Sequence, residues 1–431
     1  MIANNLNVNE TGHLTFAGQD VVTLAEKYGT PLYLLDEGAI RARCRLYRRA
    51  MQAAFGKDAL PLYAGKALCV KDIYRIMREE EMGIDVVSSG EIYTAAAAGF
   101  PMERAYFHGN NKTDADVAYA MEAGVGTFVC DTVEELDAIE AEAAARGITQ
   151  RILLRLTPGI DPHTHRAICT GQVDSKFGAA IETGAAEALV LAALARPHVA
   201  LIGYHCHIGS QIFEADPFLE AARIMMRFIA AMRDAHGYVA TELNLGGGMG
   251  VRYLAEHPEV DYAANIAAIG KEVASLAAAL KLPIPAIRME PGRSIVADAG
   301  MTVYTVGSVK RIEGFKNYVS VDGGMPDNPR FALYGSPYTV VLANRMRDER
   351  DFVASIAGRC CESGDLIQEG VALPTPVRGD LLAVLTTGAY NYAMASNYNR
   401  IPRPPMVVLA DGTDRLIVKR ESFEDLLRNE L

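Results

Sequence analysis

The stretch Leu60-Pro61-Leu62-Tyr63-Ala64-Gly65-Lys66-Ala67 places one lysine at the point where an apolar strand gives way to a helix. The helical spacing of Ile73, Ile76 and Met77 follows directly. A lysine at the carboxyl end of a buried strand can pair with an acid, hold a phosphate or form an imine with an aldehyde. Taken alone, the stretch favours the ion pair. The groups at the strand ends that follow it favour the imine instead.

Seven further apolar runs of strand length follow the first, separated by alanine-rich segments of helical period. The eight runs cover residues 60–66, 83–88, 105–108, 127–131, 152–156, 201–205, 242–245 and 287–290. Eight such units in series are typical of a (β/α)8 barrel, and an open doubly wound sheet is the alternative. Polar and glycine-rich clusters follow almost every run. They favour the barrel, because a barrel brings all its strand ends to one rim.

After residue 300 the pattern changes to short Val/Tyr/Thr-rich runs separated by turns rich in Gly, Pro and Asp, which is typical of a β domain. Two short strand candidates before residue 37, at 14–16 and 31–35, can pair with that domain. Residues 422–431 are expected to form a closing helix with Ser422 as its N-cap. The predicted fold class is therefore α/β plus β. A TIM-like barrel spans 37–300, and residues 1–36 and 301–431 form a β-sandwich or β-barrel domain.

The composition is that of an ordinary soluble protein of 431 residues, with a formal net charge of −11. That charge, without a basic patch, is unlike a nucleic-acid-binding protein. The seven cysteines are irregularly spaced, which disfavours both a disulfide framework and a zinc site and fits a reducing cytoplasm. The N-terminus lacks the pattern of a signal peptide, and we expect no membrane span.

Two runs at the last strands carry groups suited to a phosphorylated aromatic cofactor. The glycines Gly246, Gly247 and Gly248 can bring backbone N–H groups close to an anion, although a tight turn explains them equally well. Barrel phosphate sites cluster after strands seven and eight, which favours the anion. Glu290 ends strand eight and needs a partner: either an ion pair with Arg293 or the nitrogen of a pyridine ring, which a carboxylate keeps protonated.

Strand six ends in His205-Cys206-His207-Ile208-Gly209-Ser210. Two histidines at this spacing can share one face and bind a metal, but no third ligand is evident nearby and no metal is predicted. A flat imidazole can instead stack on a cofactor ring. Gly209 and Ser210 can donate to its phosphate.

Three further groups have both a functional and a structural interpretation. Cys361, flanked by Glu362, can donate a proton or be inert. Arg330 ends a turn-rich loop and can bind a carboxylate bidentately or lie solvated at the surface. Tyr390 lies in an apolar stretch, where packing is the commoner role of a tyrosine.

The order of motifs along the chain resembles that of the diaminopimelate decarboxylase family, pyridoxal-phosphate enzymes of the alanine-racemase-like, fold-type III class. The resemblance runs from about residue 30 to residue 400. It is carried by YAGKA, HGNNK, DSKFG, HCHIGSQ, NLGGGMG, EPGR, VDGGMPDNPRFALYG, CESGD and GAYNYAMASNYN together. It departs in small ways: many relatives have serine where Gly65 stands, and Cys360 has no role that can be carried over.

The resemblance implies the residues of the active site. The catalytic residues are Lys66, which forms the imine with the cofactor, and Cys361, the proton donor. The cofactor-binding residues are Lys66, Asp85, His207, Gly209, Ser210, Gly247, Gly248, Glu290, Gly292, Arg293 and Tyr390. The substrate-binding residues are Arg293, Arg330, Tyr334, Glu362 and Tyr390. The family implies a homodimer in which Cys361 and Glu362 serve the neighbouring subunit's site.

The implied activity is decarboxylation of meso-2,6-diaminopimelate at its D-centre to L-lysine and CO2, the last step of lysine biosynthesis, with pyridoxal 5'-phosphate as the cofactor. The alternatives are a related decarboxylase of ornithine, arginine or carboxynorspermidine, or a non-catalytic regulatory homologue. The paired arginines and the CESGD loop favour diaminopimelate. Residues 161–177 have a polar, His-rich composition that would suit a lid over the pocket.

Overall fold

The structure is a computed structural model that describes residues 2–160 and 175–431. The chain separates into two compact units. The β unit comprises residues 1–42, 251–259 and 293–431, and the barrel unit comprises residues 43–250 and 260–292. The segment 251–259 therefore groups with the β unit, although it lies inside the range expected for the barrel.

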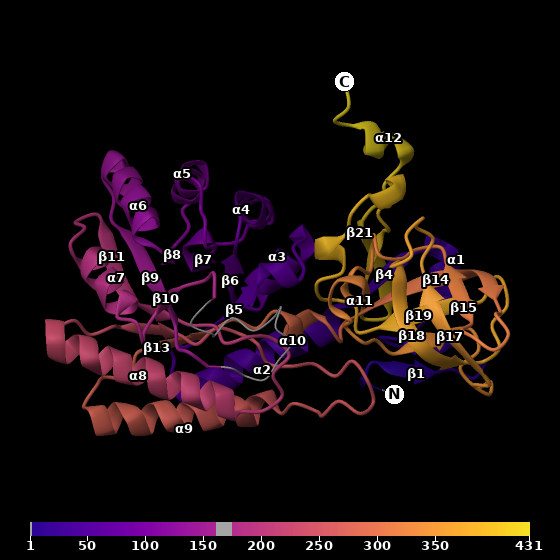
Figure 1. Cartoon of the computed structure of the whole chain (residues 1–431), viewed down its shortest axis with the longest axis horizontal. Coiled ribbons are helices and arrows are strands. Elements are labelled where there is room, and N and C mark those ends of the chain that lie inside the picture. The colour runs from indigo at the N-terminus through magenta and orange to yellow at the C-terminus, as the bar shows by residue number, and fades with distance from the viewer. Residues whose placement is uncertain (1, 161–174) are drawn as a thin grey trace. The chain divides into compact units, whose positions relative to one another are not determined.

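The barrel unit contains a closed ring of eight parallel strands, which confirms the predicted fold class (Figure 1). The strands are β5 (Leu60–Ala64), β6 (Gly83–Val86), β7 (Ala105–Phe107), β8 (Thr127–Cys130), β9 (Gln150–Thr157), β11 (Val199–His205), β12 (Glu242–Asn244) and β13 (Ala286–Met289). β13 pairs with β5 and β8 pairs with β9, so the ring closes. A short strand, β10 (Ala179–Ala180), extends β9 on one side. The open doubly wound sheet is excluded by this closure.

Capping residues or glycines mark the ends of several helices of the chain. They are α1 (Val21–Tyr28), α2 (Glu37–Phe55), α3 (Lys71–Glu79), α4 (Ser89–Ala97), α5 (Asp114–Glu122), α6 (Val133–Arg146), α7 (Ala185–Leu194), α8 (Asp216–His236), α9 (Tyr262–Leu280), α10 (Arg293–Val296), α11 (Arg330–Tyr334) and α12 (Phe423–Leu427). α6, for example, begins after Thr132, whose hydroxyl oxygen accepts the Glu135 N–H as an N-cap, and it ends at Gly147 in the left-handed conformation.

Within the described residues, α9 is the one helix long and apolar enough to span a membrane by length and composition alone. Residues 262–280 contain only Lys271 and Glu272 as charged side chains, an apolar run that the expectation of no membrane span had overlooked. Its buried residues, among them Tyr262, Ile266 and Val273, recur at helical spacing. That spacing is typical of a helix that covers a core with one face.

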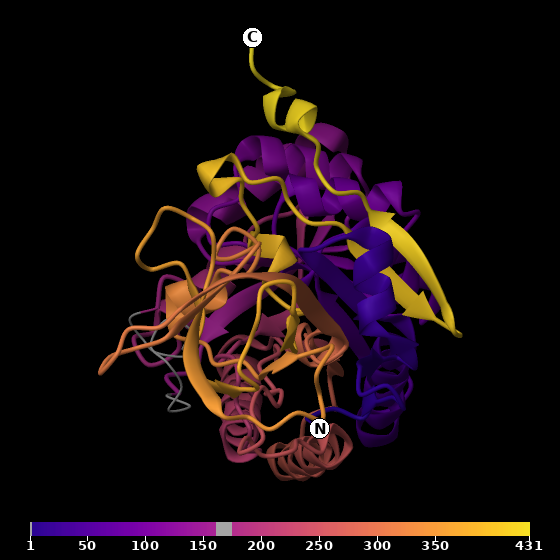
Figure 2. The same cartoon turned by 90° about the vertical axis from the view of Figure 1, so that its right-hand side faces the viewer.

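The β unit is built around a mixed sheet in the order β18-β17-β15-β14-β4-β20-β21, with β19 pairing with both β14 and β16. Its strands are β4 (Leu32–Asp36), β14 (Gly300–Lys310), β15 (Tyr318–Val321), β16 (Val340–Leu342), β17 (Phe352–Ala357), β18 (Leu366–Leu373), β19 (Leu381–Leu385), β20 (Met406–Ala410) and β21 (Thr413–Val418). The strands β1 (Leu6–Val8), β2 (Leu14–Phe16) and β3 (Gln19–Asp20) form a small separate sheet. Figure 2 shows the curled strands of this unit in orange and yellow.

The N-terminal segment belongs to the β unit, as the sequence suggested. β4 pairs with β14 and with β20, and the side chains of Leu14, Phe16 and Leu32 enter the same core as Met301 and Val303. α12 has the predicted Ser422 cap but is shorter than expected. β18 was not predicted, because Gln368, Glu369 and Gly370 interrupt its apolar alternation.

Candidate active site

A cavity of about 380 Å³ lies in the barrel unit, where the carboxyl ends of the strands meet. Its size is within the range of small-molecule sites. The lining residues are Lys66, Asp85, Val87, His108, Gly109, Asn110, Asn111, Arg155, Phe177, His207 and Glu290. Four of the residues predicted from the sequence, Lys66, Asp85, His207 and Glu290, are therefore brought together.

Lys66 lies in a single 3₁₀ turn, Gly65–Ala67, directly after β5. Its two neighbours are buried, whereas the Lys66 side chain is exposed and lines the cavity. A Cβ on Gly65 would lie 2.5 Å from the hydroxyl oxygen of Tyr74 and 3.0 Å from the carbonyl oxygen of Asp85, so the turn lies close against α3 and β6. Over residues 2–160 and 175–431, Lys66 has no hydrogen bond or ion pair, and the ion-pair interpretation of its position is not supported. The amine is available to a ligand.

Glu290 is a buried carboxylate that receives donors from three other strands. Asn244 Nδ2 donates to Oε1 over 2.7 Å, and His205 Nε2 lies 3.1 Å from Oε2. His108 Nε2 forms an ion pair with Oε1 at 2.8 Å. The alternative predicted from sequence, a Glu290–Arg293 ion pair, is wrong: Arg293 begins α10 in the β unit and bonds Tyr253 instead.

The charges in this cluster follow from burial and from the neighbours. Burial alone would raise the pKa of Glu290, but His108 and His205 hold the pKa well below its usual range. Burial lowers the pKa of His205 to about 4, so this imidazole is neutral and its Nε2 donates to Glu290. Burial also opposes the charge on His108, but the carboxylates of Asp85 and Glu290 prevail and raise its pKa. Glu290 is thus anionic and His108 favours the cation.

One polar atom on the cavity wall, Asp85 Oδ1, is buried without a hydrogen-bond partner among the described residues. His108 Nε2 lies 4.0 Å from it and is itself paired with Glu290. Buried polar atoms of this kind are rare and usually have a ligand or water as their partner. A polar aromatic group in the cavity would supply that partner.

His207 lines the cavity and contacts the glycine-rich turn that follows β12. Its Nδ1 accepts a hydrogen bond from the Gly247 N–H at 3.2 Å. Burial lowers the pKa of His207 well below the usual range, with the charges of Lys66 and Arg155 acting in the same direction. A neutral, flat imidazole held in this way suits stacking on an aromatic ring.

The loops after β11, β12 and β13 approach one another closely, because glycines stand at the contacts. A Cβ on Gly247 would lie 2.1 Å from the carbonyl oxygen of Glu290, and a Cβ on Gly248 would lie 2.4 Å from that of Gly209. Gly292 is similarly close to Ala64, at 2.9 Å. Side-chain-free backbone of this kind suits a phosphate after the last strands of a barrel. These residues fit pyridoxal phosphate: an amine, a stacking ring, a buried carboxylate and a glycine cradle.

The β unit contains a second set of predicted residues, grouped around Tyr390. The guanidinium carbons of Arg293 and Arg330 lie 4.8 Å and 5.2 Å from the centre of its ring. Arg330 also lies over the ring of Tyr334, at 5.1 Å. Both arginines are buried, and Arg330 Nε has no hydrogen-bond partner among the described residues. Two buried cations beside tyrosine rings are suited to bind a carboxylate.

Cys361 and Glu362 are exposed in the loop between β17 and β18. The Cys361 N–H donates to Asn399 Oδ1 at 2.8 Å, which fixes the backbone but leaves the thiol accessible. The structure holds one chain, so the service of these residues in a neighbouring subunit stays a prediction. The expected lid, residues 161–177, lies outside the described residues except for 175–177.

Several residues of the site were not predicted from the sequence: His108, His205, Asn244 and Arg155. His108 and Asn244 lie inside the motifs HGNNK and NLGGGMG, so a signal was present. Among the described residues, His108, His205 and Glu290 also form the one group of three whose ligand atoms could hold a metal ion, within 4.8 Å of one another. Glu290 accepts from Asn244 as well, which fits a counter-ion cluster better than a metal centre.

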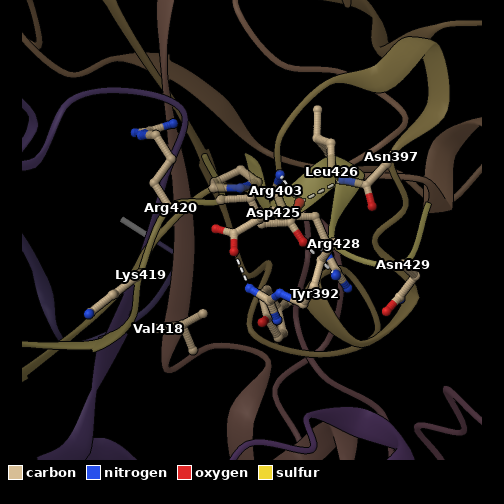
Figure 3. Close-up of a pocket in the computed structure, with 12 residues that line it drawn as sticks. Tyr392, Asn397, Arg403, Val418, Lys419, Arg420, Asp425, Leu426, Arg428 and Asn429 are labelled. Atoms are coloured by element: carbon tan, nitrogen blue, oxygen red, sulfur yellow. Dashed lines mark hydrogen bonds and ion pairs between the residues drawn. The ribbon is translucent and has the colours of Figure 1, made fainter. Parts of the chain in front are cut away.

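A larger cavity of about 610 Å³ lies in the β unit, between the end of β21 and α12 (Figure 3). Three of its four cationic side chains already have partners: Arg403 pairs with Glu421, Arg428 with Asp425, and Arg420 donates to the carbonyl of Pro31 at 2.9 Å. These interactions hold the C-terminal segment in place, which is a structural role. This cavity is therefore a weaker candidate than the cavity that contains Lys66.

Comparisons with known proteins identify the family of the chain. Residues 37–297 match the family model described as "Pyridoxal-dependent decarboxylase, pyridoxal binding domain". The diaminopimelate decarboxylase of Bacillus subtilis is 45% identical over 423 residues, covering 98% of this chain and 96% of the relative. That of Mycobacterium tuberculosis is 41% identical over 439 residues, covering 99% and 97%. The crystal structure of diaminopimelate decarboxylase from M. jannaschii in complex with L-lysine has a TM-score of 0.91 at 32% identity, covering 99% of this chain and 98% of that one.

Proposed function

We propose that this chain, which belongs to the pyridoxal-dependent decarboxylase family, converts meso-2,6-diaminopimelate to L-lysine and CO2 with pyridoxal 5'-phosphate as its cofactor. The observation that carries the proposal is the cavity in which an unpaired Lys66 shares one wall with the buried anion Glu290. The resemblance to diaminopimelate decarboxylases seen in the sequence is confirmed by relatives at 41% to 46% identity over nearly the whole chain.

The barrel unit would hold the cofactor. Lys66 would bind its aldehyde carbon, His207 would stack on its ring, and Gly247, Gly248 and Gly292 would bring backbone N–H groups to its phosphate. When bound, pyridoxal phosphate supplies an electron-withdrawing ring that accepts the electron pair left behind by CO2. Glu290 would keep the ring nitrogen protonated, because its carboxylate stays anionic among its own donors.

The remaining residues hold the substrate and move a proton. Arg293 and Arg330 would bind the carboxylate at the distal end of diaminopimelate, with Tyr334, Glu362 and Tyr390 beside it. Cys361 would deliver a proton from its Sγ to the carbon that has lost CO2. Holding the departing carboxylate in one orientation lowers the barrier further, by up to roughly 7–11 kcal/mol in well-oriented systems.

The nearest alternative is a decarboxylase of a basic amino acid. A lysine/ornithine decarboxylase from Vibrio vulnificus is structurally similar, with a TM-score of 0.74 at 25% identity. Ornithine and arginine carry a cation at the distal end, which the two buried guanidinium groups would repel. The chemistry of the β unit therefore favours a substrate with a distal carboxylate.

The direct test is to load the purified protein with pyridoxal phosphate and record its visible absorbance, then to measure CO2 release from meso-diaminopimelate and from ornithine. We expect absorbance that Lys66→Ala abolishes and CO2 release from diaminopimelate alone. Release from ornithine at an equal or higher rate would contradict the proposed substrate. An imine absorbance band that the dialysed Lys66→Ala variant still shows would point to another lysine.

We also propose a cytoplasmic homodimer with shared sites. Free thiols at all six cysteines of the described residues suit a reducing compartment. Mixing inactive Lys66→Ala protein with inactive Cys361→Ala protein should restore part of the activity, because one kind of mixed site then has both groups. Mixed dimers that form and stay inactive would show that each chain completes its own site.

A further inference from the structure

The side chain of Asp365 joins two loops of the β unit that carry predicted active-site residues. Its carboxylate is 3% exposed. Oδ1 accepts the N–H of Met325 at 2.6 Å, and Oδ2 accepts the N–H of Cys360 at 2.7 Å. Met325 lies in the loop that leads to Arg330, and Cys360 directly precedes Cys361. One side chain thus fixes both segments.

The backbone of two glycines packs directly against this carboxylate. A Cβ on Gly358 would lie 2.2 Å from Asp365 Oδ2, and a Cβ on Gly324 would lie 2.5 Å from Oδ1. Backbone bonds close the same assembly, since Arg359 N–H donates to the Gly323 carbonyl and Gly358 N–H to the Asp365 carbonyl, both at 2.9 Å. The two glycines allow the loops to lie against the carboxylate.

We infer that Asp365 is a positioning residue that sets the place of Cys361 and of Arg330 together, through the backbone of Cys360 and Met325. The inference rests on the proposed function for the roles of those two residues. A carboxylate is required because two N–H donors face two separate oxygens. An amide offers one acceptor oxygen and turns its NH2 toward the other donor. Loss of the carboxylate therefore releases at least one loop and disturbs the other.

The loop of Cys361 has a second anchor that Asp365 does not replace. Asn399 accepts the Cys361 N–H and holds a left-handed backbone conformation with φ of 51°. Successive amides of one loop are thus fixed by two different segments. Removing the Asp365 anchor alone should shift Cys361 without detaching it.

The test is Asp365→Asn, with Asp380→Asn as the matched control. Asp380 is also buried, at 4% exposed, and also accepts a backbone N–H, from Val377 at 2.9 Å, but it holds a turn that carries no predicted site residue. We expect amide hydrogen exchange in both 323–330 and 358–365 to quicken by roughly 10- to 100-fold in Asp365→Asn, the range for hydrogen bonds to a charged group. In Asp380→Asn these segments should not change.

Kinetics separates positioning from a loss of general stability. In Asp365→Asn we expect a lower kcat, from the displaced Cys361, and a higher KM, from the displaced Arg330, with the cofactor absorbance retained. Asp380→Asn should lose stability and keep both constants. Quicker exchange in only one loop, or unchanged kcat and KM despite quicker exchange in both, would overturn the inference.

Two features keep this test decisive. Exchange needs no substrate, so a failure of the proposed reaction in the unaltered protein leaves the structural half of the inference testable by itself. If Asp365→Asn does not fold, hydrogen exchange in the unaltered protein still tests the inference. The Met325 and Cys360 amides should have the same protection factor, because both become exposed when the Asp365 carboxylate moves away. Factors that differ by more than about 10-fold would overturn the inference.

Discussion

Replacing Arg330 by methionine separates substrate binding from stability, because this guanidinium is buried without an acid. It is 6% exposed, its Nε has no hydrogen-bond partner in the described residues, and its one long bond runs 3.4 Å from Nη2 to Ser336 Oγ. Among the described residues, the rings of Tyr334 and Tyr390, at 5.1 Å and 5.2 Å, lie against its charge. Such cation–π contacts contribute about 0.5–2 kcal/mol each.

The expected effects on function and stability therefore differ in size. Truncating one partner of a buried, hydrogen-bonded charge pair costs about 2–5 kcal/mol. At about 1.4 kcal/mol for each tenfold change, kcat/KM for meso-diaminopimelate should fall roughly 30-fold to several thousand-fold, mostly through KM. Stability should fall by no more than about 1 kcal/mol, because methionine fills a similar volume and a costly buried cation is removed.

The assay is steady-state CO2 release together with thermal unfolding. Arg345→Met is the control, because Arg345 is an arginine of the same unit that does have acids as partners, Asp348 at 2.7 Å and Asp380 at 3.2 Å. We expect Arg345→Met to lower the melting temperature and leave kcat/KM unchanged. If Arg330→Met instead unfolds more easily than Arg345→Met while its kcat/KM is intact, Arg330 is a structural residue and our interpretation of the β-unit cluster is refuted.

Two further predictions concern the glycine turn and a buried acid. Gly247→Ala should weaken pyridoxal phosphate binding by at least about 10-fold, because its Cβ would lie 2.1 Å from the Glu290 carbonyl oxygen. Equilibrium dialysis measures this affinity. The control is Gly307→Ala, whose Cβ would have its nearest neighbour at 3.6 Å and which should bind the cofactor normally. Burial raises the pKa of Asp327 to about 7 from 3.8. The folded state then holds a proton that the unfolded state has lost, so the contribution of Asp327 to stability is full below about pH 4 and disappears as the pH rises through 7. Urea unfolding at pH 5 and pH 8 should show a smaller loss on going to pH 8 for Asp327→Asn than for the unaltered protein, and equal losses would contradict the raised pKa.

The barrel could be predicted from the sequence because each strand ends in a chemically distinct cluster. The run that ends at Lys66 and the glycines at 246–248 identify strand ends by composition alone. β18 could not be predicted in this way, because polar residues in its middle face solvent and break the apolar alternation. Its pairing with β17 supplies the stability that its sequence lacks.

The partners of Glu290 show the limit of sequence reasoning more clearly. Its donors come from His108, His205 and Asn244, between 46 and 182 residues away along the chain. They meet because β11, β12 and β13 are neighbours in register, with His205 opposite Asn244 and Asn244 opposite Arg288. Local spacing offered Arg293 as one of two possible partners and did not indicate these three donors. Only the closed ring of strands brings the correct donors to one point.

What each unit lacks indicates the nature of the ligand. Among the described residues, the barrel unit has an amine without a hydrogen-bond partner at Lys66 and a buried carboxylate oxygen without one at Asp85. The β unit has the opposite deficiency, since Arg330 is a buried cation with no acid among the described residues. A cofactor with an aldehyde and a protonated ring nitrogen satisfies the first set, and a substrate with a distal carboxylate satisfies the second. A basic amino acid would satisfy the first and leave Arg330 without an acid, so we expect substitutions in the β-unit cluster, rather than in the barrel cavity, to change which substrate is preferred.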